Sequence, residues 1–250
     1  MVSHTKRDKR FTVLAGKSLS KQAYDEVRRL LMQGRLKPGE RLVSRLLALK
    51  LGISTTPVRE ALYRLVSERA LEMDDRNTIV VPVITAERYQ EICDLRIHLE
   101  SFAAERAVEF VTAASIDALA ALHAQHVAAE VAGNLGTALE HNERFHFGLC
   151  RLAGLTMVTN LVESLWLQCG PTLNLFYAQS ASRWPTHLHP HLRVIDGLRR
   201  SDAQAVRNAI ATDIAEGAEP ILSRLRAMRM DCDREPPYMI APVEDHVISS

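Results

Sequence analysis

STTPVREALYRL, residues 54–65, is the stretch that decides the fold of the first part of the chain. Its apolar residues, continued at residue 66, fall at positions i, i+3, i+4, i+7 and i+8, a spacing that predicts a helix with one buried face. These apolar residues are Val58, Ala61, Leu62, Leu65 and Val66. Ser54 stands where it can cap the amino end of this helix. The opposite face presents Thr55, Thr56 and Arg59.

Two further helices precede this one, and a pair of strands follows it. Apolar residues at helical spacing predict a helix over residues 19–33. A turn at residues 36–42 leads to a second, short helix near residues 43–51. The alternating segment LEMDDRNTIVVPV predicts two strands around a tight connection at residues 74–77, where Asn77 tolerates a left-handed backbone. The first part of the chain is therefore three helices and a β-wing.

The chain from Thr85 onward has few Pro and Gly residues and a helical period throughout. Helices are expected near residues 85–110, 115–132, 135–152, 156–178, 188–200 and 202–228. No segment has the period of a strand, so this half is expected to be all-helical. The boundaries that follow are a basic N-terminal arm at 1–18, a first domain at 19–82, a helical domain at 83–228 and a poorly ordered tail at 229–250.

Charge divides the chain at the same place. Residues 1–82 carry 17 Lys and Arg against 9 Asp and Glu, a net charge of +8, whereas the remaining 168 residues carry 14 against 21, a net charge of −7. Nine of the ten histidines fall after residue 97. A basic module followed by an acidic, His-rich one predicts that the first binds a polyanion and the second has a different task.

Composition excludes several classes of protein. The 250 residues are 47% hydrophobic and 24% charged, which excludes collagen-like and mainly disordered chains. The four cysteines form no CxxC pair, which favours packed thiols over a secreted disulfide framework. No apolar run approaches the roughly 18 residues needed to span a bilayer, and the polar start lacks a secretion signal. We therefore expect a soluble, cytoplasmic protein without a membrane partner.

Several segments resemble a known family. PGERL (38–42), LGIS (51–54) and STTPVREALYRL, with the wing after them, resemble the winged helix-turn-helix of GntR-family transcription regulators. EICDLRIHLE (91–100) and NERFHFGL (142–149) resemble the FCD effector domain of the FadR-type subfamily. The resemblance covers about residues 19–228. It implies a mainly α protein, in which an N-terminal winged helix-turn-helix is followed by an all-α antiparallel helical bundle.

The expected DNA contacts come from the third helix, the second helix and the wing. A recognition helix lies in the major groove, where residues near its amino end reach base edges. Thr55, Thr56 and Arg59 stand where that geometry requires, and the resemblance adds Arg45 and the wing tip at Asn77. The family often has Arg in place of Thr55 and Gly in place of Asn77, so base preference is expected to differ. A lone surface arginine can also be merely solvated, but the basic charge of this module favours DNA.

A homodimer is expected on DNA. One winged helix buries too little surface for tight operator binding, so two copies related by a two-fold axis would bind a palindromic double-stranded DNA operator. The resemblance also implies a dimer. Bound in this way, the protein would be associated with the nucleoid.

Three helices of the second half each place a potential metal ligand on an apolar stripe. Asn142 and His146 are one turn apart in the helix at 135–152, His191 follows later, and Asp213 lies in the last helix. Each alone could be an ordinary hydrogen-bonded core residue. Together they predict a site for a divalent ion, zinc before others, with open positions for an effector carboxylate. The resemblance has a histidine where Asp213 stands.

Other polar residues of this half receive weaker interpretations. Arg96 matches an arginine of the family that commonly faces the effector pocket, where it would clamp a carboxylate by two parallel hydrogen bonds. Its alternative role is a salt bridge to a neighbouring helix. His123 and His126 have ambiguous facing and are assigned no function, and His189 is expected at a helix entrance, outside the ligand set.

These features predict a transcriptional regulator, a repressor rather than an enzyme, whose helical domain binds a divalent metal and a small carboxylate effector. One alternative is a metal-dependent hydrolase fused to a DNA-targeting module, since His and Asp around zinc can activate water. Turnover of candidate carboxylates would favour that alternative, although no HExxH motif or phosphate loop is present. Another is an architectural DNA-binding dimer without an effector, which would be favoured if no metal or small molecule shifted its melting temperature.

Overall fold

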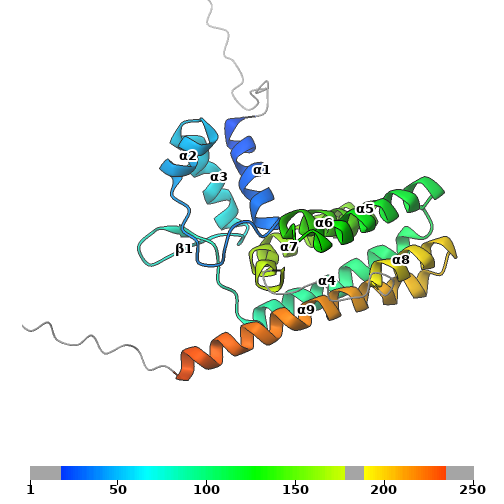
Figure 1. Cartoon of the computed structure of the whole chain (residues 1–250). Coiled ribbons are helices and arrows are strands. Elements are labelled where there is room, and N and C mark those ends of the chain that lie inside the picture. The colour runs from blue at the N-terminus through cyan, green and yellow to red at the C-terminus, as the bar shows by residue number, and fades with distance from the viewer. Residues whose placement is uncertain (1–17, 178–188, 235–250) are drawn as a thin grey trace, which may run out of the picture.

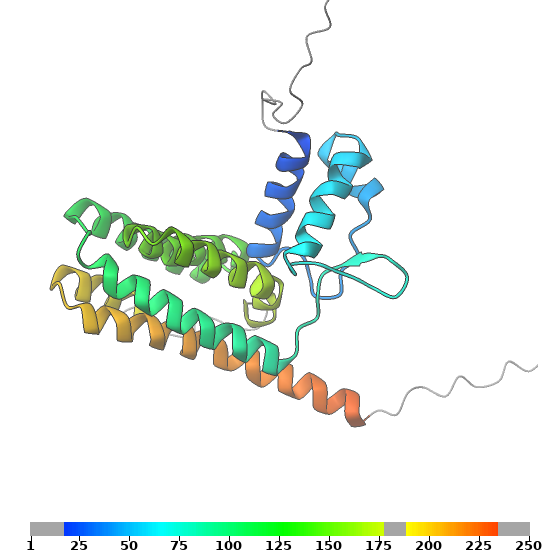
Figure 2. The same cartoon turned by 180° about the vertical axis from the view of Figure 1, so that it is seen from behind.

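The computed structural model of the protein describes residues 18–177 and 189–234. Two lobes stand side by side, an N-terminal lobe of three helices with a hairpin and a larger lobe whose described part holds six helices (Figure 1, and from behind in Figure 2). The elements are α1 (Leu19–Met32), α2 (Ser44–Leu51), α3 (Thr55–Ser67), β1 (Glu72–Met73), β2 (Ile79–Val80), α4 (Ala86–Ala107), α5 (Ala113–Val131), α6 (Leu135–Leu152), α7 (Thr156–Tyr177), α8 (Pro190–Arg199) and α9 (Ala203–Arg234). This order confirms the mainly α fold class.

The buried face predicted for the third helix forms the centre of the N-terminal lobe. Val58, Leu62 and Leu65 of α3 are fully buried, and α3 packs against α1. Ser54 occupies the cap position of α3, but its side chain makes no cap hydrogen bond. The first backbone N–H groups of α3 therefore have no side-chain cap from Ser54, unlike those of α1, where Ser18 accepts from the N–H of Lys21.

The wing is a short antiparallel hairpin. Met73 pairs with Ile79, and each strand has two residues. Asp74 shapes the turn, because its carboxylate accepts hydrogen bonds from the backbone N–H groups of Arg76 and Thr78. Asn77 has a φ of 56°, so the predicted left-handed residue is confirmed at this position.

The larger lobe consists of two layers of helices. In both views α5, α6 and α7 form one layer, and α4, α8 and α9 form the other (Figures 1 and 2). The most extensive packing within the second layer is between α4 and α9. Across the layers, α5 packs against α8 and α6 packs against α4. Side chains from all six helices therefore face one another between the layers.

The last helix is longer than the sequence indicated. α9 runs to Arg234, whereas its end was expected near residue 228. After Pro220 the chain has no Pro or Gly until Pro236, so nothing in the covalent structure stops the helix before the residues that precede that proline. Residues 1–17 of the expected N-terminal arm and residues 235–250 of the expected tail lie outside the described residues.

The two lobes meet where α1 lies against α7. A Cβ atom on Gly170 would collide with the carbonyl oxygen of Leu31, so the backbones touch at this glycine. Arg28 of α1 makes an ion pair with Glu163 of α7 at 2.7 Å, and the Gln33 side chain donates to Glu140 of α6. The N-terminal lobe is thus anchored on the helical lobe through α1.

The described residues bear on two expectations from the sequence, the state of the cysteines and the absence of a membrane-spanning helix. Cys93, Cys150 and Cys169 are free and buried, which agrees with packed thiols. No described helix combines the length and the apolar character that crossing a membrane requires.

Candidate functional site

A cavity of about 60 Å³ lies between the two layers of the helical lobe. Its lining comes from five helices and the start of a sixth, and the polar side chains in it are Arg96, His126, Glu130, Asn142, His146, His189 and Asp213. Apolar and aromatic side chains such as Trp166 and Ile221 complete the wall. A volume of this size accommodates an ion with a few water molecules or small ligand atoms.

His146 is held between two buried carboxylates. Its Nδ1 is 2.7 Å from Oε2 of Glu100 on α4, and its Nε2 is 3.0 Å from Oδ2 of Asp213 on α9. Burial alone would lower the pKa of His146, but the charge of Glu100 and the hydrogen bonds to both carboxylates raise it to about 9. The ring therefore carries a proton on each nitrogen near neutral pH.

Glu100 is the centre of a buried network. Its carboxylate accepts hydrogen bonds from Nε of Arg96 at 2.8 Å and from Nε1 of Trp166 at 3.2 Å, besides the one from His146. Burial raises the pKa of Glu100, but the charges of Arg96 and His146 outweigh it and lower the pKa to about 2. This glutamate was absent from the predicted site. Its position four residues after Arg96, on the same helical face, is the signal that could have found it.

His191 differs from His146 because its ring lacks hydrogen bonds. It is fully buried, stacks on Phe145 with 3.8 Å between ring centroids, and has no hydrogen-bond partner at Nδ1 or Nε2 within the described residues. Its Nε2 lies 3.6 Å from Oδ2 of Asp213. Burial lowers the pKa of His191 to about 4 although Asp213 opposes this, so the ring is neutral near pH 7.

Three of the four predicted metal ligands converge. One ligand atom each from His146, His191 and Asp213 lie within 4.8 Å of one another, and Asn142 lines the same cavity. These side chains offer donors that suit a divalent ion, because His191 has a ring nitrogen with no hydrogen-bond partner among the described residues and Asp213 has a carboxylate oxygen. Glu100 can go on accepting the hydrogen bond from Nδ1 of His146 while Nε2 of the same ring binds an ion. Binding would replace the Nε2 proton that His146 now shares with Asp213.

Arg96 has features of both roles predicted for it, a lining residue of the effector pocket and a member of a salt bridge. Its guanidinium lines the cavity and lies 4.1 Å from the centroid of the Trp166 ring. It forms an ion pair, but with Glu100 on its own helix and not with a neighbouring helix as the alternative had it. Four residues along one helix bring the two side chains together, which sequence spacing alone allows.

Three histidines that the sequence left without a function also enter this region. His123 and His126 of α5 and His189 before α8 are buried. The two α5 histidines, whose orientation the sequence left open, therefore point inward. The two α5 histidines continue a buried stripe that begins with Ile116 and Leu119, a local signal that could have placed them. His189 caps α8, as expected for a helix entrance, but it also lines the cavity.

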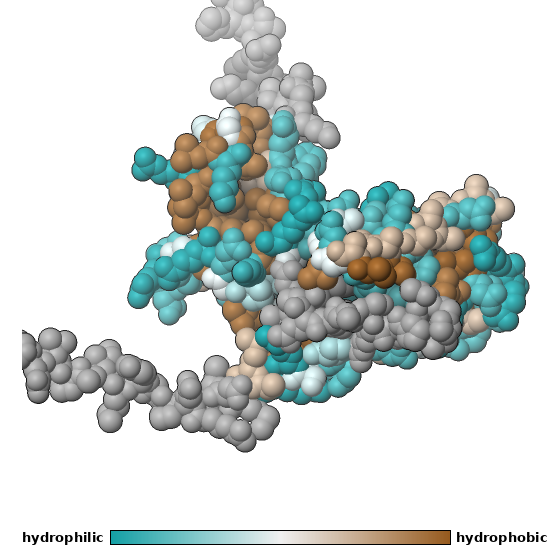
Figure 3. Space-filling model, viewed as in Figure 1, coloured by the Kyte–Doolittle hydropathy of each residue, from teal (hydrophilic) through white to brown (hydrophobic). Residues whose placement is uncertain are grey.

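The residues predicted to contact DNA lie on the surface of the N-terminal lobe. Arg45 at the start of α2, the first residues of α3 (Thr55 and Thr56) and Arg59 one turn later are exposed, and so is Asn77 at the wing tip. Hydrophilic residues cover the projecting wing in Figure 3. Arg45 makes no ion pair with any described residue, so its charge is available to a partner.

Comparison with known proteins gives consistent results for both lobes. Residues 19–81 match the model described as bacterial regulatory proteins, gntR family, and residues 91–216 match the FCD domain. The chain is 31% identical over 195 residues to the HTH-type transcriptional regulator McbR of Escherichia coli (strain K12), a match that covers 78% of this chain and 88% of McbR.

A solved structure and a second relative extend this result. The structure of E. coli McbR/YncC aligns with a TM-score of 0.76 at 29% identity, covering 86% of this chain and 100% of that one. The gluconate operon transcriptional repressor of Bacillus subtilis (strain 168) is 33% identical over 84 residues, which is 34% of each chain.

Proposed function

Since this chain belongs to the gntR family of bacterial regulatory proteins and carries an FCD domain, we propose that it is a repressor whose operator binding responds to a small ligand. Membership makes it a DNA-binding transcriptional regulator and not an enzyme, and removes the hydrolase alternative. The observation that carries the proposal is the pairing of an exposed, basic reading lobe with a buried, polar cavity in the lobe behind it.

For DNA recognition we assign the exposed surface of α2, α3 and the wing. Arg59 would read a base edge in the major groove, with Thr55 and Thr56 beside it, while Arg45 and Asn77 would contact the backbone. The uncapped amino end of α3 supports this assignment, because free backbone N–H groups suit a phosphate oxygen. Two copies on a palindromic operator would double these contacts, with the protein at the nucleoid.

The DNA assignment is tested by operator binding of Arg59→Ala. Loss of an Arg–guanine pair costs about 1–3 kcal/mol, so discrimination between the operator and random duplex should fall by roughly 5- to 150-fold. Fluorescence anisotropy with both duplexes at several salt concentrations measures this. Unchanged discrimination by the variant, or binding of the wild type that ignores salt, would contradict the assignment.

For the cavity we propose a divalent ion, zinc first, on His146, His191 and Asp213, with Asn142 as a further oxygen donor. The bound ion would supply a positive charge that a small carboxylate effector can pair with, and Arg96 in the cavity wall would help to orient the effector. Glu100 would hold His146 in the tautomer that presents Nε2. The effector must favour one placement of the reading lobes over another to change operator affinity.

The ion assignment is tested by elemental analysis of the purified protein and of His146→Ala. The variant should bind zinc at least about tenfold more weakly than the wild-type protein, and an unchanged zinc affinity would contradict the ligand set. Melting temperatures with zinc, and with small carboxylates added to the zinc-loaded protein, test the effector. No shift with any of them would favour the architectural DNA-binding dimer instead.

Repression, rather than activation, is proposed because one relative, the gluconate operon transcriptional repressor, is named as a repressor. A reporter gene placed behind the operator measures the direction. Reporter output should rise when the regulator gene is deleted, and output that falls would show activation.

A further inference from the structure

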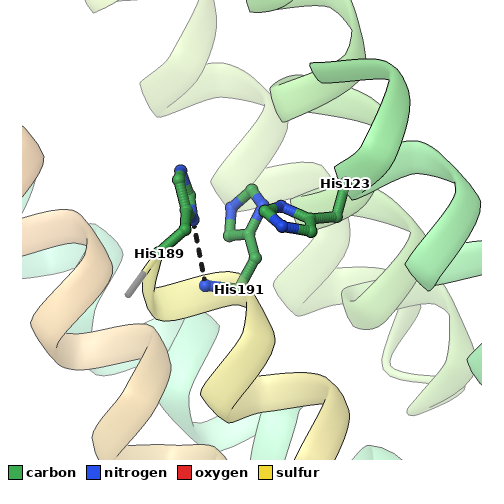
Figure 4. Close-up of side chains that lie close together, drawn as sticks. All are labelled: His123, His189 and His191. Atoms are coloured by element: carbon green, nitrogen blue, oxygen red, sulfur yellow. Dashed lines mark hydrogen bonds between the residues drawn. The ribbon is translucent and has the colours of Figure 1, made fainter. Parts of the chain in front are cut away.

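A second group of imidazoles surrounds His191 and includes two histidines outside the first ligand set. His123 of α5, His189 and His191 each place one ligand atom within 4.8 Å of the others (Figure 4). The ring centroid of His123 lies 5.0 Å from that of His189 and 5.6 Å from that of His191, and the centroids of His189 and His191 are 4.4 Å apart. All three side chains are buried.

Several nitrogen atoms of this group lack hydrogen bonds. Nδ1 of His123 and both ring nitrogens of His191 are buried and have no partner among the described residues. A buried polar atom without a partner is costly, and native structures leave few of them without a reason such as an ion or a water molecule. Three such atoms on two neighbouring rings indicate a binding site rather than packing.

The rings are also held in place before any ligand arrives. His189 accepts a hydrogen bond at Nδ1 from the backbone N–H of His191 at 3.1 Å, with Pro190 between them at the start of α8. His191 is fixed by its stack on Phe145. His126 donates from Nδ1 to the carbonyl oxygen of Ala138 and packs 5.3 Å from His189, closing the group on one side.

We propose that His123, His189 and His191 form a second metal site, which takes a divalent transition ion of the kind that prefers imidazole nitrogen, such as zinc, nickel, cobalt or copper. Magnesium and calcium prefer oxygen and would not bind three imidazoles. It differs in two of its three residues from the family set, the ligands His146, His191 and Asp213 proposed above, and it does not depend on an effector.

His191 belongs to both ligand sets. A neutral imidazole has a single lone pair to donate, so His191 serves one ion at a time. Each protomer therefore binds one ion on either His146 and Asp213 or His123 and His189, with His191 common to both. Coordination by His189 would compete with its cap hydrogen bond, so the amino end of α8 should change on loading.

The test separates the two sets by substitution in the full-length chain. His146→Gln with Asp213→Asn disables the family set while it keeps side-chain shape and hydrogen bonding, and the same chain with His123→Phe and His189→Phe disables both. His98→Ala, a histidine on the exposed face of α4, is the matched control. Zinc content after dialysis and copper(II) electron paramagnetic resonance, which counts coordinated nitrogens, are measured on each, with circular dichroism to verify folding.

The first variant should retain one ion per protomer, with a copper spectrum from three imidazoles, and the second should retain none. Absence of metal from a folded first variant, or metal unchanged by His123→Phe and His189→Phe in that background, would overturn the proposal. A single His123→Phe change in the first variant gives an independent measure, because loss of one of three ligands should weaken zinc affinity at least about tenfold. Failure of this second site leaves the family set untouched, since His146→Ala in a chain that already carries His123→Phe and His189→Phe tests that set alone.

Discussion

The two lobes use their charged side chains in opposite ways. In the N-terminal lobe Arg45 and Arg59 are exposed on helices whose buried faces are apolar. In the helical lobe Arg96, Glu100 and His146 are buried and bonded to one another. An exposed charge stays hydrated, so leaving it unpaired costs little folding free energy and it remains available to a partner such as DNA. A buried charge loses its hydration and must be paired within the fold. Substitution of the exposed charges is therefore expected to leave the N-terminal lobe stable, whereas substitution of the buried charges should destabilise the helical lobe.

The largest expected effect is on Glu100. Glu100→Ala would leave Arg96 buried without its carboxylate and remove the acceptor for His146 and Trp166. Breaking a buried pair in this way costs about 3–5 kcal/mol in the free energy of unfolding. Urea unfolding measures it, with Glu91→Ala on the exposed ion pair to Arg88 as control. If both substitutions cost the same, the contrast between buried and exposed charge is wrong.

A second effect tests how the lobes are joined. Gly170→Ala would push α7 away from the Leu31 carbonyl oxygen of α1, and we expect it to destabilise the protein by about 1–3 kcal/mol. Gly217→Ala is the matched control: its added Cβ meets nothing within 4 Å, and replacing a helical glycine should stabilise by about 0.5–1 kcal/mol. Opposite signs in thermal unfolding support a close α1–α7 contact. The same sign for both would contradict it.

A third effect concerns pH at the junction of the lobes. Burial, with the charges of Glu140 and Glu163, raises the pKa of Glu143 to about 7, although Arg28 opposes this. Between pH about 4.5 and 7 the folded state binds more protons than the unfolded state, so Glu143 lowers stability as the pH rises through this range. Glu143→Gln should remove the loss and stabilise the protein at pH 8 by on the order of 1–3 kcal/mol.

Urea unfolding of both proteins from pH 5 to pH 8 measures this difference. The two curves should lie closest at pH 5 and separate towards pH 8. Parallel curves across the range would show that Glu143 titrates as an ordinary surface carboxyl.

The smallest effect on stability is expected on the reading surface. Arg45→Ala should change the free energy of unfolding by less than about 0.5 kcal/mol, because the side chain is exposed and makes no ion pair with a described residue. It should nevertheless weaken binding to all duplexes alike and reduce the salt dependence by about one counterion. A destabilised variant, or unchanged DNA affinity, would place Arg45 outside the DNA contact that we assign to it.

Local sequence pattern determined the elements of both lobes. The i, i+4, i+7 spacing of Val58, Leu62 and Leu65 placed the buried face of α3, and Asn77 marked the turn of the wing, because helices and turns depend on neighbours a few residues apart. The same locality placed Asn142 and His146 one turn apart on an inward stripe. Exposure of Arg45 and Arg59 also followed from these patterns.

Tertiary structure decided which buried polar groups meet. His123 stands more than sixty residues before His189 and His191, and Glu100 of α4 contacts His146 of α6. No spacing in the chain records such a contact, since it depends on how α4, α5, α6, α8 and α9 pack into two layers. The sequence by itself thus determined the helices and the residues that each turns inward. Only the packing of the two layers decided which residues these inward side chains contact. The physical reason is that a buried charge or lone pair takes its partner from whichever side chain lies next to it in the fold, however distant that residue is along the chain.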